Sequence, residues 1–292
     1  MDGKTTLTGL LGWPVEHSLS PALHNAAFAA LGLNWAYLPL PTPPEHLPDV
    51  LRGLARCGFR GLNVTIPHKQ AVLPLLDALS PTAAALGAVN TISIQTAEDG
   101  TPCLRGDNTD VEGFLHPLRA QSHTPRSAVV VGAGGAARAV IYGLLQLGTR
   151  KIYLLNRNPA HALQLAQSLQ PLAEDGAGII PLPFGSSTLI EACQTAELLV
   201  NTTPLGMWPH TQGCIWPEVT PIPARLTVYD LVYNPYQTRL LQIAEQSGAR
   251  AIGGLEMLIH QAAAAFQIWT GQPAPIETML QACPPSWRNP SC

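Results

Sequence analysis

A glycine-rich turn after residues 127–131 limits what this chain folds into more than any other feature. Residues 127–131 are an apolar run typical of a buried strand, and Gly-Ala-Gly-Gly-Ala-Ala follows at 132–137. This order matches the Gly-x-Gly-x-x-Gly/Ala fingerprint of dinucleotide-binding units when a helix comes next. Gly132 permits the tight turn, Gly134 lets the backbone approach a pyrophosphate, and Ala137 lets the helix pack closely on the sheet. The turn therefore predicts a Rossmann-like unit with a pyrophosphate at its helix N-terminus.

The next strand, expected at 151–155, indicates which dinucleotide binds. It ends at Asn156-Arg157-Asn158, where enzymes that select NAD usually carry an acidic residue for the ribose hydroxyls. Asn156 forms hydrogen bonds without repelling a phosphate, and Arg157 neutralises a phosphate and stacks on adenine. We therefore expect NADP as the cofactor. The structural alternative is an exposed arginine after a strand.

Strands and helices alternate along most of the chain. Further strands expected at 179–182, 198–201 and 226–230 predict a doubly wound sheet after the glycine turn. Before the turn, strands at 7–11, 35–40, 61–66 and 89–94 and helices at 22–31, 44–56 and 70–78 predict a second, mostly parallel α/β sheet.

The length of 292 residues favours two domains. We expect one domain at residues 1–110 plus 254–292, and a Rossmann-like NADP-binding domain at 111–253. The long apolar helix expected at 254–270 then returns to the first domain.

A lysine follows the strand expected at 61–66. The sequence Asn-Val-Thr-Ile-Pro-His-Lys at 63–69 ends the strand at Pro67 and leaves Lys69 just beyond it. An amine held at a strand end binds an anion or transfers a proton, whereas most lysines are solvated surface residues. Ser18 and Ser20 similarly suit either a carboxylate site or a helix cap.

Composition excludes several classes of function. Only 12% of residues are charged, the formal net charge is -3, and there is no run of lysine or arginine. Nucleic acid and anionic membranes are therefore poor candidates for partners. The six cysteines show no Cys-x-x-Cys spacing and no cluster with histidine, so no metal site is expected. His17, His24 and His68 stand at no metal or nucleophile spacing, which favours structural roles.

No targeting or membrane segment is expected. The apolar stretch near the N-terminus is broken by Gly9, Gly12 and Pro14, and the alanine-rich segment at 262–265 is too short to span a bilayer. We therefore expect a cytoplasmic protein.

Taken together and in order, seven motifs resemble the shikimate dehydrogenase family over nearly the whole chain. They are SLSP at 18–21, NVTIPHK at 63–69, GAVNT at 87–91, GDNTD at 106–110, the glycine loop, NTTPLGM at 201–207 and GLEMLIHQ at 254–261.

The resemblance implies a role for particular residues. Lys69 and Asp110 form the catalytic pair in the substrate domain. The substrate-binding set is Ser18, Ser20, Thr65, Lys69, Asn90, Asp110, Tyr233 and Gln261. The cofactor-binding set is Gly132, Ala133, Gly134, Gly135, Ala136, Asn156, Arg157, Asn158, His161, Leu231 and Gly254. The family commonly has a second arginine where this chain has His161, which bears on how strictly NADP is preferred.

The resemblance also implies a reaction, the reversible reduction of 3-dehydroshikimate to shikimate with NADPH in aromatic amino-acid biosynthesis. Lys69 is expected to donate the proton in reduction and accept it in oxidation. A quinate/shikimate dehydrogenase, often NAD-dependent, is the alternative, and a non-catalytic NADP-binding sensor is a more distant one. Partners are then small molecules only, and the protein is a monomer or a homodimer.

Overall fold

The chain divides into two compact units. The computed structural model describes residues 1–174 and 176–287. One unit comprises Met1–Thr109 and Ile259–Pro284, and the other comprises Asp110–Leu258 and, among the described residues, also 285–287. The division falls inside one helix, α10 (Gly254–Thr270). Each unit has its own sheet and is described separately below.

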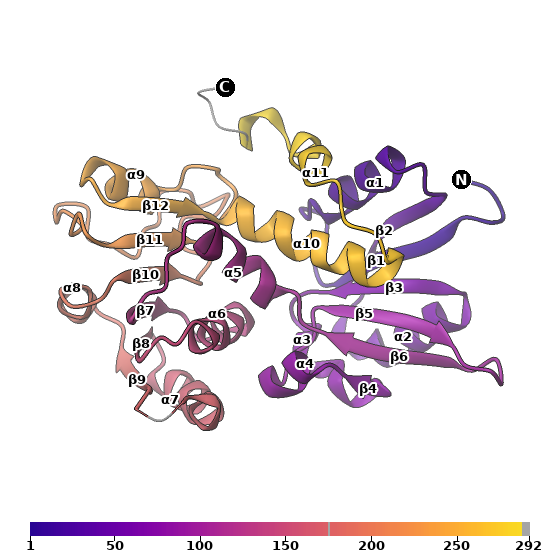
Figure 1. Cartoon of the computed structure of the whole chain (residues 1–292), viewed down its shortest axis with the longest axis horizontal. Helices are drawn as coiled ribbons and strands as arrows, with labels where there is room; N and C mark the ends of the chain where they lie inside the picture. The colour runs from indigo at the N-terminus through magenta and orange to yellow at the C-terminus, as the bar shows by residue number, and fades with distance from the viewer. Residues whose placement is uncertain (175, 288–292) are drawn as a thin grey trace. The chain divides into compact units, whose positions relative to one another are not determined.

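The first unit is built on a mixed sheet of six strands, drawn in indigo to magenta in Figure 1. Its order is β2-β1-β3-β5-β6-β4. The strands are β1 (Thr6–Gly12), β2 (Trp35–Pro41), β3 (Phe59–Val64), β4 (Ala78–Leu79), β5 (Thr91–Thr96) and β6 (Pro102–Asp107). β1 runs parallel to β2 and β3, as does β4 to β6, whereas β5 is antiparallel to β3 and β6. The sheet is thus mostly parallel, as the alternation predicted.

Short helices connect these strands. They are α1 (Ser20–Ala30), η1 (Pro44–His46), α2 (Leu47–Arg56), α3 (His68–Ala71), η2 (Leu73–Leu75) and α4 (Pro81–Leu86), with α11 (Ile276–Ala282) near the C-terminal end of the unit. α11 packs on α1. Leu11, Leu62 and Ile92 are fully buried in the centre of the sheet. The sheet therefore gives the segments after β1 and β3 a rigid support.

The helix expected at 70–78 is wrong. α3 ends at Ala71, a 3-10 turn follows, and Ala78 already belongs to β4. Pro74 explains the difference, because a proline lacks the N–H of a helical hydrogen bond and its ring collides with the carbonyl four residues earlier. The strand expected at 61–66 also ends early, at Val64. Thr65 and Lys69 consequently lie on a compact turn.

The second unit contains a fully parallel sheet of six strands. They are β7 (Ser127–Val131), β8 (Lys151–Asn156), β9 (Gly178–Pro183), β10 (Leu198–Asn201), β11 (Thr227–Asp230) and β12 (Arg250–Gly253), in the order β12-β11-β10-β7-β8-β9. The order reverses between β10 and β7, as in doubly wound nucleotide-binding folds. The predicted doubly wound sheet is confirmed, and β12 is a further strand that the sequence pattern does not predict.

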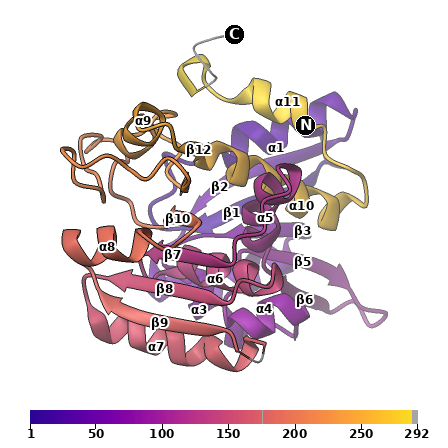
Figure 2. The same ribbon diagram turned by 60° about the vertical axis from the view of Figure 1, so that its left-hand side comes forward.

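The helices of this unit are α5 (Asp110–Ala120), α6 (Gly135–Gln146), α7 (Pro159–Leu169), η3 (Gln170–Leu172), α8 (Ser186–Cys193) and α9 (Arg239–Gln246), and η4 (Pro285–Trp287) comes last. α7 lies along β9 in both views (Figures 1 and 2). Val129, Leu199 and Val228 are buried completely. Parallel strands read as continuous apolar runs because both of their faces are covered. Among the described helices, none has the length and apolarity that crossing a membrane requires.

Candidate active site

The glycine turn of the second unit has the backbone that the sequence predicted. Gly132 has φ +112, a conformation that side chains disfavour, and a Cβ there would collide with Thr202 Oγ1. Gly134 is the N-cap of α6, and a Cβ there would meet open space. The turn thus leaves the backbone accessible at the start of α6, where N–H groups favour anions.

A cavity of about 510 Å³ opens at this turn. It lies at the carboxyl ends of β7, β8 and β10, where the strand order reverses. Ligands of open α/β sheets bind at this point. The lining residues are Val131, Gly132, Ala133, Gly134, Asn156, Arg157, Phe184, Thr202, Thr203, Pro204, Leu205, Met207, Trp208, Pro209, His210 and Gly213. None of them is acidic, so no carboxylate in the lining repels an anionic cofactor.

Asn156 and Arg157 lie at the end of β8, as expected for residues that meet an adenosine phosphate. Asn156 Nδ2 donates to Asn158 O at 2.9 Å, and Arg157 is exposed. The side chain of Asn158 is already used, because its Oδ1 accepts from Ala160 N at 3.0 Å and caps α7. The residues present therefore fit NADP, because Arg157 offers an exposed cation and no acidic residue lines the cavity.

Several residues of the predicted cofactor set do not line the cavity. Gly135 and Ala136 belong to the first turn of α6, and His161 is exposed on α7. A Cβ on Gly254 would collide with the carbonyl of Leu231, so these two pack against each other. The sequence reasoning missed Phe184, Trp208 and His210. The position of Phe184 directly after β9 is the signal that could have indicated it.

Lys69 of the first unit sits on α3, on the turn that follows β3. It is half-buried, and its backbone O accepts from Val89 N at 2.8 Å. Val64 N donates to Asn90 O at 2.8 Å, and Thr65 N donates to Leu11 O at 2.8 Å. These backbone bonds bring the segments of Thr65, Lys69 and Asn90 together within the unit.

Asn90 belongs to a buried network of neutral side chains. Its Oδ1 accepts from Thr109 N at 2.8 Å and from Thr91 Oγ1 at 3.0 Å. Asn63 Nδ2 donates to Thr91 Oγ1 at 3.1 Å, and Asn63 Oδ1 accepts from Tyr37 Oη at 2.8 Å. Such a network restricts Asn90 to one orientation.

Ser18 and Ser20 precede and open α1. Ser18 Oγ accepts from Ser20 N at 3.2 Å, and the N-cap residue, Leu19, offers no side-chain cap. Ser20 is therefore not the cap that the alternative interpretation required. His68 is buried, with Nε2 2.7 Å from Thr42 O, which suits the structural role expected for it.

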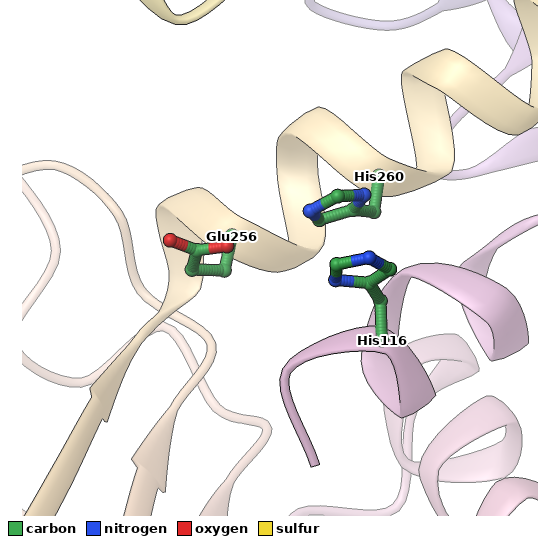
Figure 3. Close-up of side chains that lie close together, drawn as sticks. All are labelled: His116, Glu256 and His260. Carbon is green, nitrogen blue, oxygen red and sulfur yellow. The ribbon is translucent and has the colours of Figure 1, made fainter. Parts of the chain in front are cut away.

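The other predicted substrate residues are distributed over the chain. Asp110 is buried at the start of α5, and Tyr233 follows β11, where burial raises its pKa. Gln261 lies on α10, next to His260. Figure 3 shows Glu256 and His260 on successive turns of α10, and His116 on α5.

Comparisons with known proteins give the family. Three family models match in succession: the shikimate dehydrogenase substrate binding domain at residues 10–92, shikimate/quinate 5-dehydrogenase at 118–176, and the shikimate 5'-dehydrogenase C-terminal domain at 254–283. A relative from Moorella thermoacetica, named shikimate dehydrogenase (NADP(+)), is 47% identical over 287 residues, covering 94% of this chain and 92% of the relative. The chain belongs to the shikimate dehydrogenase family.

Solved members of the family have the same fold. The shikimate 5-dehydrogenase of Thermus thermophilus, in complex with NADP(H) and shikimate, is 39% identical, with a TM-score of 0.80 over 95% of this chain and 98% of that chain. Quinate dehydrogenase of Corynebacterium glutamicum, in complex with NAD, is 32% identical, with a TM-score of 0.85 over 95% and 98%. The fold of shikimate dehydrogenases therefore accommodates both cofactors, and the residues of the site must distinguish them.

Proposed function

We propose that this chain is an NADP-dependent shikimate dehydrogenase that interconverts 3-dehydroshikimate and shikimate. The observation that carries the proposal is the 47% identity over nearly the full length to a relative named shikimate dehydrogenase (NADP(+)). The cavity of the second unit supports it, because an arginine and an asparagine, and no acid, end β8 there.

The first unit supplies most of the proposed substrate residues. Ser18 and Ser20 hold the carboxylate of the substrate, and Thr65, Asn90, Tyr233 and Gln261 meet the ring hydroxyls or the reacting region. The side chain of Asn90 has a fixed orientation before the substrate binds, because its amide oxygen accepts hydrogen bonds from Thr109 and Thr91. A prepositioned donor needs no reorganisation when the substrate binds.

Lys69 is the proposed proton-transfer group, and Asp110 is its proposed partner. Bound NADPH supplies the hydride for the carbonyl carbon. Lys69 Nζ then donates a proton to the alkoxide oxygen in reduction and accepts it in oxidation. Asp110 orients the amine and a substrate hydroxyl. Lys69 lies in α3 and is half-buried, and Asp110 is buried as the first residue of α5, which suits a fixed geometry.

Oxidation of shikimate and of quinate, each with NADP and with NAD, tests the proposal. We expect the highest kcat/KM for shikimate with NADP. Equal or better rates with quinate and NAD would favour the alternative, a quinate/shikimate dehydrogenase, for which the likeness to the quinate dehydrogenase structure is the specific observation. Tight NADP binding without turnover of either substrate would favour the sensor.

A further inference from the structure

Two buried polar residues end neighbouring strands of the second sheet. Asn201 is the last residue of β10 and Asp230 the last of β11, and they stand opposite each other in the parallel register. Asp230 Oδ1 accepts from Asn201 Nδ2 at 2.9 Å and from Val232 N at 3.1 Å, and Oδ2 accepts from Thr238 Oγ1 at 2.6 Å. Asp230 is completely buried, so its carboxylate is satisfied by these donors in place of water.

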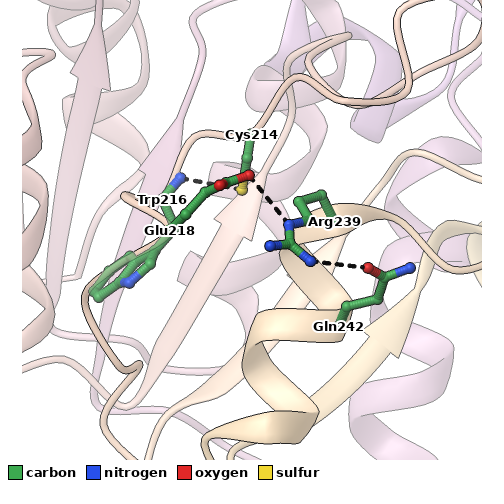
Figure 4. Close-up of polar contacts among 5 residues, drawn as sticks. All are labelled: Cys214, Trp216, Glu218, Arg239 and Gln242. Carbon is green, nitrogen blue, oxygen red and sulfur yellow. Dashed lines mark hydrogen bonds and ion pairs between the residues drawn. The ribbon is translucent and has the colours of Figure 1, made fainter.

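The donors to this carboxylate are neutral. Within the described residues, no cationic side chain forms an ion pair with Asp230. Arg239, which follows Thr238, instead donates to Glu218 at 3.2 Å and to Gln242 at 3.4 Å (Figure 4). Burial raises the pKa of the Cys214 thiol, and the negative charge of Asp230 adds to the effect. Burying a charge without a cation beside it lowers the stability of the fold, so a role other than stability is expected of Asp230.

The carboxylate determines which way the amide of Asn201 points. An ionised carboxylate only accepts hydrogen bonds, whereas an amide side chain has a donor end and an acceptor end. Asn201 must therefore turn Nδ2 toward Asp230. Its Oδ1 then faces the other way and accepts from Thr203 N at 3.0 Å and from Thr203 Oγ1 at 2.7 Å.

The orientation of Asn201 fixes the loop at the cavity. Thr203 Oγ1 accepts from Leu205 N at 3.2 Å, and Asn201 Nδ2 also donates to Leu205 O at 3.3 Å. Thr203 and Leu205 line the cavity with Met207 and with the glycine turn at Gly132. One amide thus joins the buried carboxylate to the wall of the cofactor cavity.

We propose that Asp230 is a positioning residue for the cofactor. Its carboxylate can only accept hydrogen bonds, so it fixes the orientation of the Asn201 amide, and this amide holds the loop 202–207 in its binding conformation. The proposal rests on the proposed function, because it requires NADP(H) to occupy this cavity. Asp230 itself does not line the cavity and acts through Asn201.

Asp230→Leu is the direct test, since leucine has the same branched shape, with two methyl groups in place of the two acceptor oxygens. The dissociation constant of NADPH is measured from NADPH fluorescence, and kcat and the Michaelis constant for dehydroshikimate are measured at saturating NADPH. We expect the dissociation constant to rise about tenfold, the size of one lost hydrogen bond to a charged group. The Michaelis constant for dehydroshikimate should change less than the dissociation constant of NADPH, because among the proposed substrate residues only Tyr233 lies on the segment that Asp230 holds.

Thr203→Val tests the same connection from the other side and leaves the buried charge satisfied, so it remains informative even if Asp230→Leu does not fold. We expect a rise of about fivefold in the dissociation constant of NADPH. Thr149→Val is the matched control, because Thr149 is equally a threonine whose hydroxyl donates one hydrogen bond, to Pro125 O at 2.8 Å. The control loses stability and keeps its NADPH affinity.

Combining Asp230→Leu with Thr203→Val measures the coupling. Residues that act through one amide give a double variant whose loss is smaller than the product of the two single losses. Folded single variants with the dissociation constant of the wild type, or losses that multiply fully, would overturn the proposal. A wild-type protein that does not bind NADPH would instead overturn the proposed function.

Discussion

His24 of the first unit and Asp230 of the second unit are both completely buried ionisable side chains, but their surroundings differ. His24 of the first unit stacks on Tyr37, with ring centroids 4.5 Å apart, and also contacts the rings of Phe28 and Trp269. Neither ring nitrogen has a hydrogen-bond partner within the described residues. Asp230 of the second unit, by contrast, receives three hydrogen bonds.

The difference follows from which form each environment favours. Burial lowers the pKa of His24 to about 3, so its ring is neutral at pH 7. Burial also raises the pKa of Asp230, to about 6, yet this leaves the carboxylate charged at pH 7. A neutral ring packs like any aromatic side chain, whereas a charge needs donors and imposes a direction on them. The surroundings of His24 are therefore held by uncharged packing, and those of Asp230 by an oriented polar network.

The largest expected effect is a loss of turnover, from a change in the first unit, without a loss of NADPH binding. Lys69→Ala removes the proposed proton-transfer group of the first unit, and turnover should fall by about 10²–10⁴. The dissociation constant of NADPH should stay near that of the wild type, because its proposed residues belong to the second unit. Lys151→Ala is the control, since Lys151 lies over the ring of Tyr153 on β8. Unchanged turnover in Lys69→Ala would remove the catalytic assignment.

The next largest effect is expected on NADPH binding alone, from a change in the second unit. Arg157→Ala should weaken NADPH binding by roughly tenfold to a hundredfold, as expected for a lost charge-assisted bond to phosphate, and leave NADH binding unchanged. Arg150→Ala is a matched control, because Arg150 directly precedes the strand that Arg157 follows. Equal losses for NADPH and NADH would show that Arg157 does not select the phosphate.

The acid response of the first unit depends on His24. Its folded pKa lies below the unfolded value of 6.5, so its contribution to stability is present above pH 6.5 and is lost as the pH falls toward 3. Between pH 7 and pH 5, the free energy of unfolding should drop by about 2 kcal/mol on account of this group. His24→Leu should remove that dependence in urea titrations at the two pH values. An identical drop in the variant would contradict the buried neutral ring.

The second unit should show a smaller effect of opposite sign. The folded pKa of Asp230 lies above its unfolded value of 3.8, so its contribution is present below pH 3.8 and is lost as the pH rises through about 6. From pH 5 to pH 7, the titration of Asp230 should lower the free energy of unfolding by about 1 kcal/mol. The stability of the wild type relative to Asp230→Asn should therefore fall with rising pH, as measured by urea unfolding. A rise would mean that the fold favours the charged form.

The local features that the sequence encodes directly were predictable. The turn at Gly132, the parallel strand pattern and the absence of an acid beside Arg157 are each readable from a few consecutive residues. The roles of Lys69 and Asp110, in contrast, come from the resemblance and stay predictions. Local reasoning failed where a single residue overrides a pattern, as Pro74 does after α3.

The polar networks were not predictable, because their partners are distant in sequence. From the sequence, Asn63 is only a residue of the strand expected at 61–66, yet its side chain bonds Tyr37 and Thr91, which lie 26 and 28 residues away. The residues next to Asp230 in the sequence do not indicate its role, because that role depends on the hydrogen bond from Asn201, 29 residues earlier. Burial and register, which only the folded chain specifies, decide these pairings.

The most direct test of the whole account is NADPH oxidation by the purified protein on addition of 3-dehydroshikimate, repeated with NADH. The account predicts substrate-dependent oxidation of NADPH, with a much lower kcat/KM for NADH. No oxidation with either cofactor, or a clear preference for NADH, would contradict it.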